Sequence, residues 1–202
     1  MERTVAPSVP PDVSSARALA FPEAGQTERL APPPVLDADQ RAAADELIHG
    51  PRGGVYGPFR PLLHRPPLLR AAAKLGETLR YEGTLDAALR EWTICVVARE
   101  TENVFEWEMH HPLAVRTGVP VAALEALATR SALPADLDPG LALAAQVARE
   151  LLAAHRIGEA TYAQALAQWG EARLVELLTL AGYFAMVCWL MNVARTPGPR
   201  QG

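Results

Sequence analysis

The sequence predicts an all-α protein with one folded domain, and three observations lead to this prediction. Apolar residues recur with the 3.6-residue period of a helix in several long segments, for example between Leu85 and Val96. Proline and glycine mark the starts and ends of these segments. No segment alternates polar and apolar residues between turn signals, as a half-buried strand would. With 202 residues, 50% of them apolar, the chain is long enough to bury a sizeable core.

The folded domain is expected to span residues 35–197. Residues 1–34 are rich in Pro, Ala and Ser and have no hydrophobic period, so we expect them to form a disordered tail. Residues 198–202 are expected to form a disordered C-terminus. The first residues lack the apolar core of a signal peptide.

Capping residues and helix breakers set the expected helix bounds. Asp37 and Gln40 have the spacing of a capping box, Thr84 can cap a longer helix, and Asp138 followed by a proline is a strong start signal. Pro112 lies inside a helix and should kink it. The expected helices are 37–49, a short turn at 59–64, 66–79, 84–99, 103–118, 120–127, 139–155, 159–168 and 171–195.

A glycine-rich loop from Gly50 to Pro58 separates the first two helical segments. Loops of this composition often run against a ligand or another backbone. A plain connector is an equally good interpretation.

Charge and cysteine content exclude some classes of function. The net charge of −4 predicts no basic surface, so we expect no nucleic-acid partner. Cys95 and Cys188 lie in apolar runs and form no Cys-x-x-Cys motif. They indicate buried thiols in a reducing, cytoplasmic compartment rather than a disulfide framework.

The segment from Leu177 to Ala194 is apolar and 18 residues long, the lower limit for a membrane-spanning helix. It contains Thr179, Gly182 and Asn192. A helix that is apolar on all sides is better explained as a core helix or a subunit contact, so we expect no membrane insertion.

The most informative stretch begins at Asn103, a good N-cap for the helix that follows. Glu106 and His110 are spaced i,i+4, so their side chains meet on one face of that helix. A carboxylate beside an imidazole is a usable proton-transfer pair, because each group shifts the pKa of the other. A capped helix start with a surface ion pair is the alternative interpretation.

Three segments together resemble the carboxymuconolactone decarboxylase family, within the superfamily that includes the alkylhydroperoxidase D-like (AhpD-like) proteins. They are Gly57-Pro-Phe-Arg-Pro-Leu-Leu-His-Arg-Pro66, Leu89-Arg-Glu-Trp92 and Phe105-Glu-Trp-Glu-Met-His-His-Pro-Leu-Ala114. The resemblance covers roughly residues 37–197 in order and spacing. It implies an AhpD-like helical fold and a site containing Glu91, Glu106 and His110.

The peroxidase branch of that superfamily has a Glu followed by Cys-x-x-Cys-x-x-x-His. The Glu corresponds to Glu91 and the His to His110, while the two cysteine positions are occupied by Asn103 and Glu106. A thiol peroxidase needs one thiolate to attack peroxide and a second thiol to resolve the product. Peroxidase activity is therefore implied by the superfamily label alone.

Cofactor-independent lyase chemistry is the expected function, on a small carboxylated lactone or keto acid of aromatic breakdown. His110 is the candidate acid, Glu106 its tuning partner and Glu91 a second carboxylate or proton relay. The candidate substrate-binding residues are Arg60, which can hold a carboxylate, and His64, Asn103 and Trp107. No metal or organic cofactor is required if the substrate supplies its own carbonyl as an electron sink.

Two alternatives remain open at this stage. Glu91, Glu106 and His110 could instead hold a metal ion, since carboxylate and imidazole are acceptable ligands. The chain could also be a non-catalytic oligomeric or binding protein that kept the fold. The resemblance further implies a homo-oligomer, a trimer or a hexamer, and the apolar last helix fits a subunit contact.

Overall fold

The computed structural model describes residues 27–199, and in this part of the chain every regular element is helical. The prediction of an all-α fold is thus confirmed. The elements are α2 (Ala38–His49), α3 (Phe59–Leu62), α4 (Pro66–Glu77), the π-helical turn η1 (Thr78–Glu82), α5 (Ala87–Glu100), α6 (Val104–Arg116), α7 (Val121–Thr129), α8 (Pro139–Ala154) and α9 (Glu159–Ala194).

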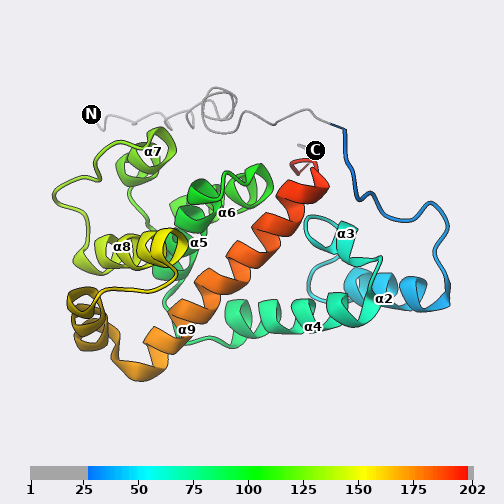
Figure 1. Cartoon of the computed structure of the whole chain (residues 1–202), viewed down its shortest axis with the longest axis horizontal. Coiled ribbons are helices and arrows are strands. Elements are labelled where there is room, and N and C mark those ends of the chain that lie inside the picture. Colours follow the sequence, from blue (N-terminus) through cyan, green and yellow to red (C-terminus); the bar gives the residue numbers. More distant parts are fainter. Residues whose placement is uncertain (1–26, 200–202) are drawn as a thin grey trace, which may run out of the picture.

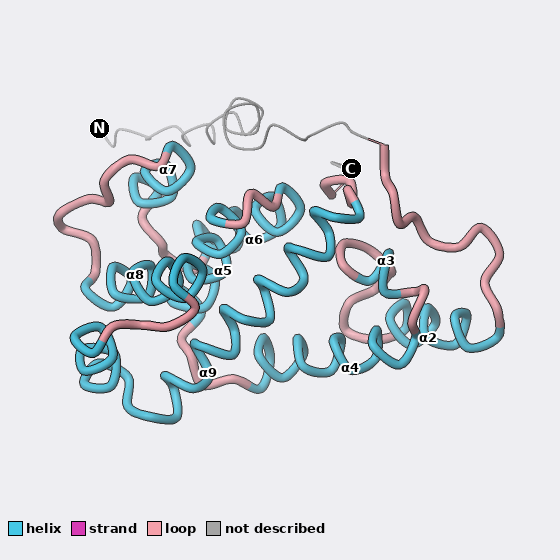
Figure 2. Tube along the Cα trace, in the orientation of Figure 1, coloured by secondary structure: helices cyan, strands magenta, loops and turns pink. Residues whose placement is uncertain are grey.

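Helices α5 and α9 organise the fold. Helix α9 runs through the middle of the molecule, with α5 to α8 on one side of it and α2 to α4 on the other (Figures 1 and 2). Helix α5 packs against α6, α8 and α9. Its side chains are buried almost continuously from Leu89 to Arg99, and the Trp92 indole donates a 2.7 Å hydrogen bond to the Leu141 carbonyl of α8.

The apolar interior consists of two separate clusters. The larger lies among α5 to α9 and includes Trp92, Phe105 and Phe184. The smaller lies among α2, α3 and α4 and includes Phe59 and Leu69. The boundary between the two clusters is where the candidate site is found.

The start of α5 differs from the expected one. Its N-cap is Asp86, which accepts a hydrogen bond from the Leu89 N–H, rather than Thr84. Thr84 instead donates from its backbone and its hydroxyl to the Glu176 carboxylate of α9, at 2.7–2.9 Å. The local sequence pattern predicted Thr84 as the cap of this helix, but Thr84 instead hydrogen bonds to Glu176, 92 positions further along the chain.

Helix α9 breaks at Gly170, which has a positive φ of 72°. This agrees with the prediction of two separate helices, 159–168 and 171–195. By length and composition alone, α9 could cross a membrane. However, 56% of its most apolar 18-residue window is buried inside the protein, and core helices of this kind meet the same criterion.

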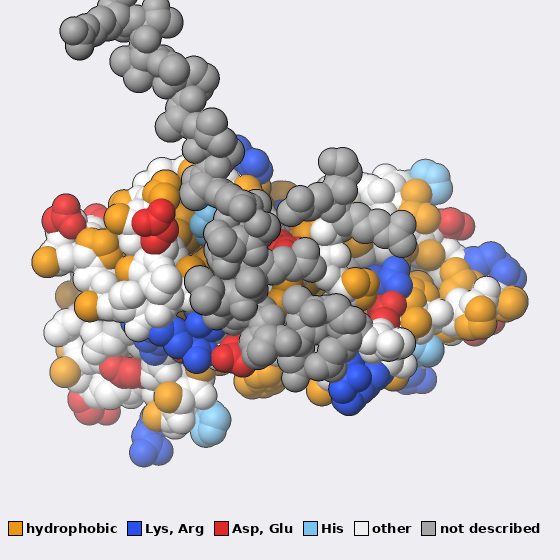
Figure 3. All heavy atoms as spheres, turned by 90° about the horizontal axis from the view of Figure 1, so that it is seen from above, with side chains coloured by type: hydrophobic (Ala, Val, Ile, Leu, Met, Phe, Trp, Pro, Cys, Tyr) orange, Lys and Arg blue, Asp and Glu red, His pale blue; other side chains and the backbone are white. Residues whose placement is uncertain are grey.

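The surface has mixed charge. On the face shown in Figure 3, acidic and basic side chains are interspersed among the described residues, without a continuous basic region. This agrees with the net charge of −4.

Part of the segment that the sequence assigns to a tail lies against the folded body. Glu28 forms a two-pronged ion pair with Arg60, with 2.9 Å from Nε to Oε1 and 2.6 Å from Nη2 to Oε2. The carbonyl of Ala31 lies 2.9 Å from His64 Nε2. The expected boundary at residue 34 is therefore too late for these contacts, while the rest of the expected tail, residues 1–26, and residues 200–202 lie outside the described residues.

These contacts predict different effects for two N-terminal deletions. Deletion of residues 1–26 keeps the Glu28 ion pair and the 2.7 Å hydrogen bond from the Arg29 N–H to the Ala194 carbonyl. Deletion of residues 1–34 removes both, so we expect its Tm to be lower than that of the shorter deletion by roughly 2–8 °C, from a charge-assisted contact of about 1–2 kcal/mol. Thermal unfolding followed by circular dichroism measures the difference, and Glu28→Gln in the full chain is the matched control. Equal Tm values would show that the docked segment adds no stability.

Candidate active site

His110 lies between two carboxylates in the interior of the protein. Its Nδ1 atom is 2.6 Å from Glu91 Oε2, and its Nε2 atom is 3.2 Å from Glu106 Oε2. All three side chains are buried, with residue exposures of only 3–4%. The structure thus brings together the three residues that the sequence proposed, and the interpretation as a surface ion pair is wrong.

Two packed helices hold these groups in place. The Asn103 side chain caps α6 by accepting from the Glu106 N–H at 2.9 Å, which fixes the first turn. Glu106 and His110 then lie one turn apart on the face of α6 that packs against α5, and α5 supplies Glu91. The Glu106 carboxylate points to His110 rather than back to the backbone of the cap.

The protonated form of His110 is favoured. Burial alone would lower the pKa of His110, but the hydrogen bonds to Glu106 and Glu91 outweigh it and raise that pKa above its ordinary value. An imidazole can donate from both nitrogens only as the cation, which fits a carboxylate on each side. Burial opposes the charge on Glu91 too, yet its hydrogen bond to His110 and the charge of Arg90, 3.3 Å away, lower its pKa.

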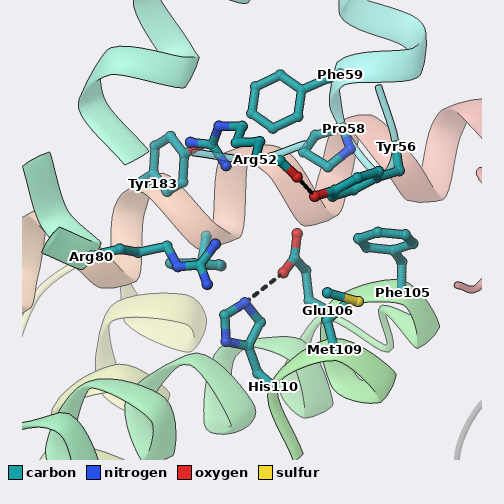
Figure 4. Close-up of a pocket in the computed structure, with 11 residues that line it drawn as sticks. Arg52, Tyr56, Pro58, Phe59, Arg80, Phe105, Glu106, Met109, His110 and Tyr183 are labelled. Carbon is teal, nitrogen blue, oxygen red and sulfur yellow. Dashed lines mark hydrogen bonds and ion pairs between the residues drawn. The ribbon is translucent and has the colours of Figure 1, made fainter. Parts of the chain in front are cut away.

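A small pocket opens onto one side of this cluster (Figure 4). Its volume of about 40 Å³ is room for about three water molecules. Glu106 and His110 line it, whereas Glu91 lies behind His110 and does not. The remaining walls are Arg52, Tyr56, Pro58 and Phe59 before α4, Arg80 of η1, Phe105 and Met109 of α6, and Tyr183 and Phe184 of α9.

The glycine-rich loop forms part of this pocket. Gly57 has a positive φ of 57°, and a Cβ atom there would overlap the Phe105 ring. The Tyr56 hydroxyl donates to the Arg52 carbonyl and closes the loop on itself. The loop therefore packs against the Phe105 side chain at the pocket, while its approach to a ligand stays a prediction.

Sequence reasoning missed four polar pocket residues: Arg52, Tyr56, Arg80 and Tyr183. The loop composition was a signal for the first two. Tyr183 sits in the apolar stretch of α9, and burial raises its pKa to about 12, so its hydroxyl stays protonated. Gly76 of α4 leaves room for that hydroxyl, since a Cβ there would overlap it.

The four expected substrate-binding residues do not line the pocket. Arg60 is held by Glu28 and His64 lies beside the Ala31 carbonyl, so neither faces this pocket, and their assignment to a substrate stays a prediction. Asn103 caps α6 and also donates to Asn192 Oδ1 at 2.7 Å, which ties α6 to α9. Trp107 is buried, with its ring 5.3 Å from that of His111.

The geometry does not match a metal site. The two carboxylates face opposite nitrogens of one ring, so the three side chains share no common point at which an ion could bind. Among residues 27–199, no other group of three His, Cys, Asp or Glu side chains is placed to hold one.

Both cysteines are free and fully buried. Burial raises the pKa of each thiol well above its ordinary value, and the nearby negative charge of Glu106 adds to this effect. Neither thiol lines the pocket.

The pKa directions of the adjacent histidines predict opposite pH effects on stability. For His110, whose folded-state pKa is raised, the stabilisation is complete below the ordinary value of 6.5 and is lost as pH rises through the folded pKa. For His111, whose pKa burial lowers, the neutral form is favoured in the folded state, so stability is lost as pH falls below 6.5. Denaturant unfolding measured at a series of pH values tests both.

We expect His110→Gln to remove the loss of stability above pH 6.5, and His111→Gln to remove the loss just below it. Each variant is the control for the other. If the stability of His110→Gln still falls as pH rises above 6.5, as in the unaltered protein, His110 is not the protonated partner of the two carboxylates.

Comparison with known proteins supports the fold. No protein-family model and no curated protein matches the chain. Among solved structures, the chain is similar to an alkylhydroperoxidase AhpD core, an uncharacterized peroxidase-related protein from Ralstonia eutropha JMP134. The TM-score is 0.67 and the identity 19%, over 88% of this chain and 95% of the other.

At this level of identity, the likeness shows the fold and leaves the activity open. It agrees with the all-helical architecture and confirms the fold that the sequence resemblance implied. The chain has the alkylhydroperoxidase D-like fold.

Proposed function

We propose that this protein is a cofactor-independent lyase that removes CO2 from a small carboxylated lactone or keto acid by proton transfer. The supporting observation is the buried His110, which is bonded to two carboxylates and borders a pocket. A protonated imidazole in a partly dehydrated pocket is a competent general acid. The arrangement also favours an enzyme over a non-catalytic binding protein, because the groups converge rather than point apart.

In the proposed reaction, the C–C bond to the carboxylate breaks and its electron pair moves into the adjacent carbonyl, which gives CO2 and an enolate. The enolate carbon then takes the proton from a ring nitrogen of His110. The substrate loses CO2 and gains one proton, and His110 becomes neutral. Solvent returns the proton, with Glu106 at the pocket wall as the nearest relay.

The two carboxylates have different proposed roles. Glu106 borders the pocket and hydrogen bonds to the His110 nitrogen that faces it, so it both tunes the acid and can pass a proton. Glu91 lies behind the ring, where it fixes the orientation of His110 and keeps its pKa high.

Hydroperoxide reduction is the second candidate. The observation in its favour is the fold neighbour, which is described as a peroxidase-related protein. The chain's own thiols give this candidate no support, since both are buried away from the pocket with raised pKa values.

We expect His110→Gln to lower kcat for CO2 release by about 10²–10⁴-fold with little change in KM, because the amide keeps a similar reach but cannot donate a titrating proton. Glu106→Gln should have a smaller effect. A screen of carboxylated lactones and β-keto acids, with CO2 release as the readout, provides the substrate for this measurement.

Two controls accompany that measurement. His111→Gln changes the adjacent residue, which lies outside the pocket, and should leave kcat unchanged. The double change Cys95→Ser, Cys188→Ser should preserve CO2 release in the folded protein. Hydroperoxide reduction that disappears in the folded double variant, with no CO2 release from any substrate, would establish the second candidate instead.

We also propose that the chain self-associates through α9. Four large apolar side chains on one face of this helix are exposed: Val175, Met186, Trp189 and Val193, at 45–63%. Met186, Trp189 and Val193 recur at helical spacing and form one apolar patch, and Val175 lies three turns earlier on the same face, beyond Thr179 and Gly182. A patch of this kind is typical of a subunit contact.

Light scattering at micromolar concentration should give the mass of a trimer or a hexamer, and Trp189→Lys should reduce it. Tyr162→Lys is the matched control, because Tyr162 is also an exposed aromatic residue, at 45% against 57% for Trp189, but lies before the break at Gly170. A stable monomer for the unaltered chain would exclude the proposal.

A further inference from the structure

We propose that Arg80 is the anion-binding group of the pocket and that it holds a carboxylate of the ligand opposite His110. This inference rests on the proposed function for the identity of the reaction, but the binding it describes can be measured without turnover. It assigns to Arg80 the role that the sequence gave to Arg60.

Arg80 lies beside the pocket, where the chain changes from an α-helix to a π-helical turn. Helix α4 passes directly into the π-helical turn η1, which is wider than an α-helical turn and changes the direction of its side chains. Within this turn Leu79 is buried in the core and Arg80 is partly exposed in the pocket wall. Single π-helical turns of this kind occur frequently at functional sites.

The end of this turn is held by α9. The Glu176 carboxylate accepts hydrogen bonds from the N–H groups of Thr84 and Leu85. A Cβ atom at Gly83 would overlap that carboxylate, so the close approach requires glycine. The wider turn is therefore a fixed feature that keeps Arg80 at the pocket, rather than a frayed helix end.

Arg80 is the pocket cation without a carboxylate partner in the described part of the chain. The other pocket arginine, Arg52, donates to the Ala73 carbonyl at 3.0 Å, lies 3.8 Å from Glu77 and covers the Phe59 ring at 4.4 Å. Arg80 has no ion pair or side-chain hydrogen bond within residues 27–199; the Tyr81 ring lies 5.4 Å from its guanidinium carbon, and its charge acts on Glu91 and Tyr183 without a direct bond. Its guanidinium is available to a ligand.

The arrangement of charge in the pocket favours a carboxylate at Arg80. In Figure 4, Arg80 extends from its helix toward the side of the pocket that holds Glu106 and His110. Glu106 already bonds to His110, and the Tyr183 hydroxyl is neutral. Neither group therefore competes with a ligand carboxylate for the Arg80 guanidinium. A planar guanidinium binds a carboxylate with two parallel hydrogen bonds, which fixes the orientation of the bound molecule.

The alternative role for Arg80 is purely electrostatic, because its positive charge also helps to lower the pKa of Glu91. Such a role needs no ligand contact. A charged probe and a neutral probe of the same shape distinguish the two roles.

The experiment uses malonate and malonamide as probes of the full-length protein, with binding followed by calorimetry or by ligand-observed NMR at pH 7. We expect malonate to bind at millimolar concentration and malonamide to bind at least tenfold more weakly. Arg80→Gln should weaken malonate binding by about 10- to 100-fold, the loss typical of a hydrogen-bonded charge pair. Arg80→Lys should retain part of the affinity, because it keeps the charge and loses the two-pronged geometry.

Arg60→Gln is the matched control. It removes an arginine that Glu28 already neutralises outside the pocket, so malonate binding should not change. Equal malonate binding by Arg80→Gln and the unaltered protein, equal binding of malonamide and malonate, or no malonate binding by the unaltered protein would each overturn the inference.

The outcome for Arg80 is separable from that of the proposed function. Malonate binding that depends on Arg80, with no CO2 release from any substrate, leaves this inference in place and rejects the lyase. CO2 release with the same KM in Arg80→Gln supports the lyase and rejects Arg80 as the anchor.

Discussion

The site depends on the pairing of a buried imidazolium, His110, with two buried carboxylates, and Arg90 beside Glu91 offsets the remaining negative charge. Two carboxylates and one imidazole are removed from water between α5 and α6, and each carboxylate contacts a different nitrogen of the same ring. Isolated charges in such a place are strongly destabilising, so the helices tolerate them only as a set. This coupling explains why α5 and α6 must pack in one register. It also means that the protonated histidine contributes both to the packing of these helices and to the proposed chemistry.

The position of the pocket follows from the way the interior is divided. Phe59 belongs to the smaller cluster of α2 to α4, while Phe105 and Phe184 belong to the larger one. Where two apolar clusters meet without merging, polar groups can reach the boundary from both sides. Arg52 and Arg80 arrive from one side and Glu106 and His110 from the other.

The sequence predicted what depends on local spacing and missed what depends on distant contacts. Helix periodicity and the Asn103 cap were sufficient to place Glu106 beside His110, and the family resemblance added Glu91. The pairing of Arg60 with Glu28 could not be predicted, because Glu28 lies in a segment that composition marks as a tail. Arg80 could not be predicted from the sequence, because the direction of its side chain depends on a π-helical turn, and no periodic pattern predicts such a turn. Its direction also depends on Glu176, 96 positions further along the chain.

The proposed chemistry depends on the residue at position 106. Where the peroxidase branch has a thiol, this chain has a carboxylate whose closest ionisable neighbour is His110. A histidine beside a thiol can remove its proton and so create a nucleophile. A histidine between two carboxylates has the opposite tendency, since both partners stabilise its protonated form. Both thiol positions of that branch differ in this chain, which has Asn103 and Glu106 there. The raised pKa of His110 between two carboxylates is therefore the physical reason for proposing a lyase, in which His110 protonates carbon, over a thiol peroxidase.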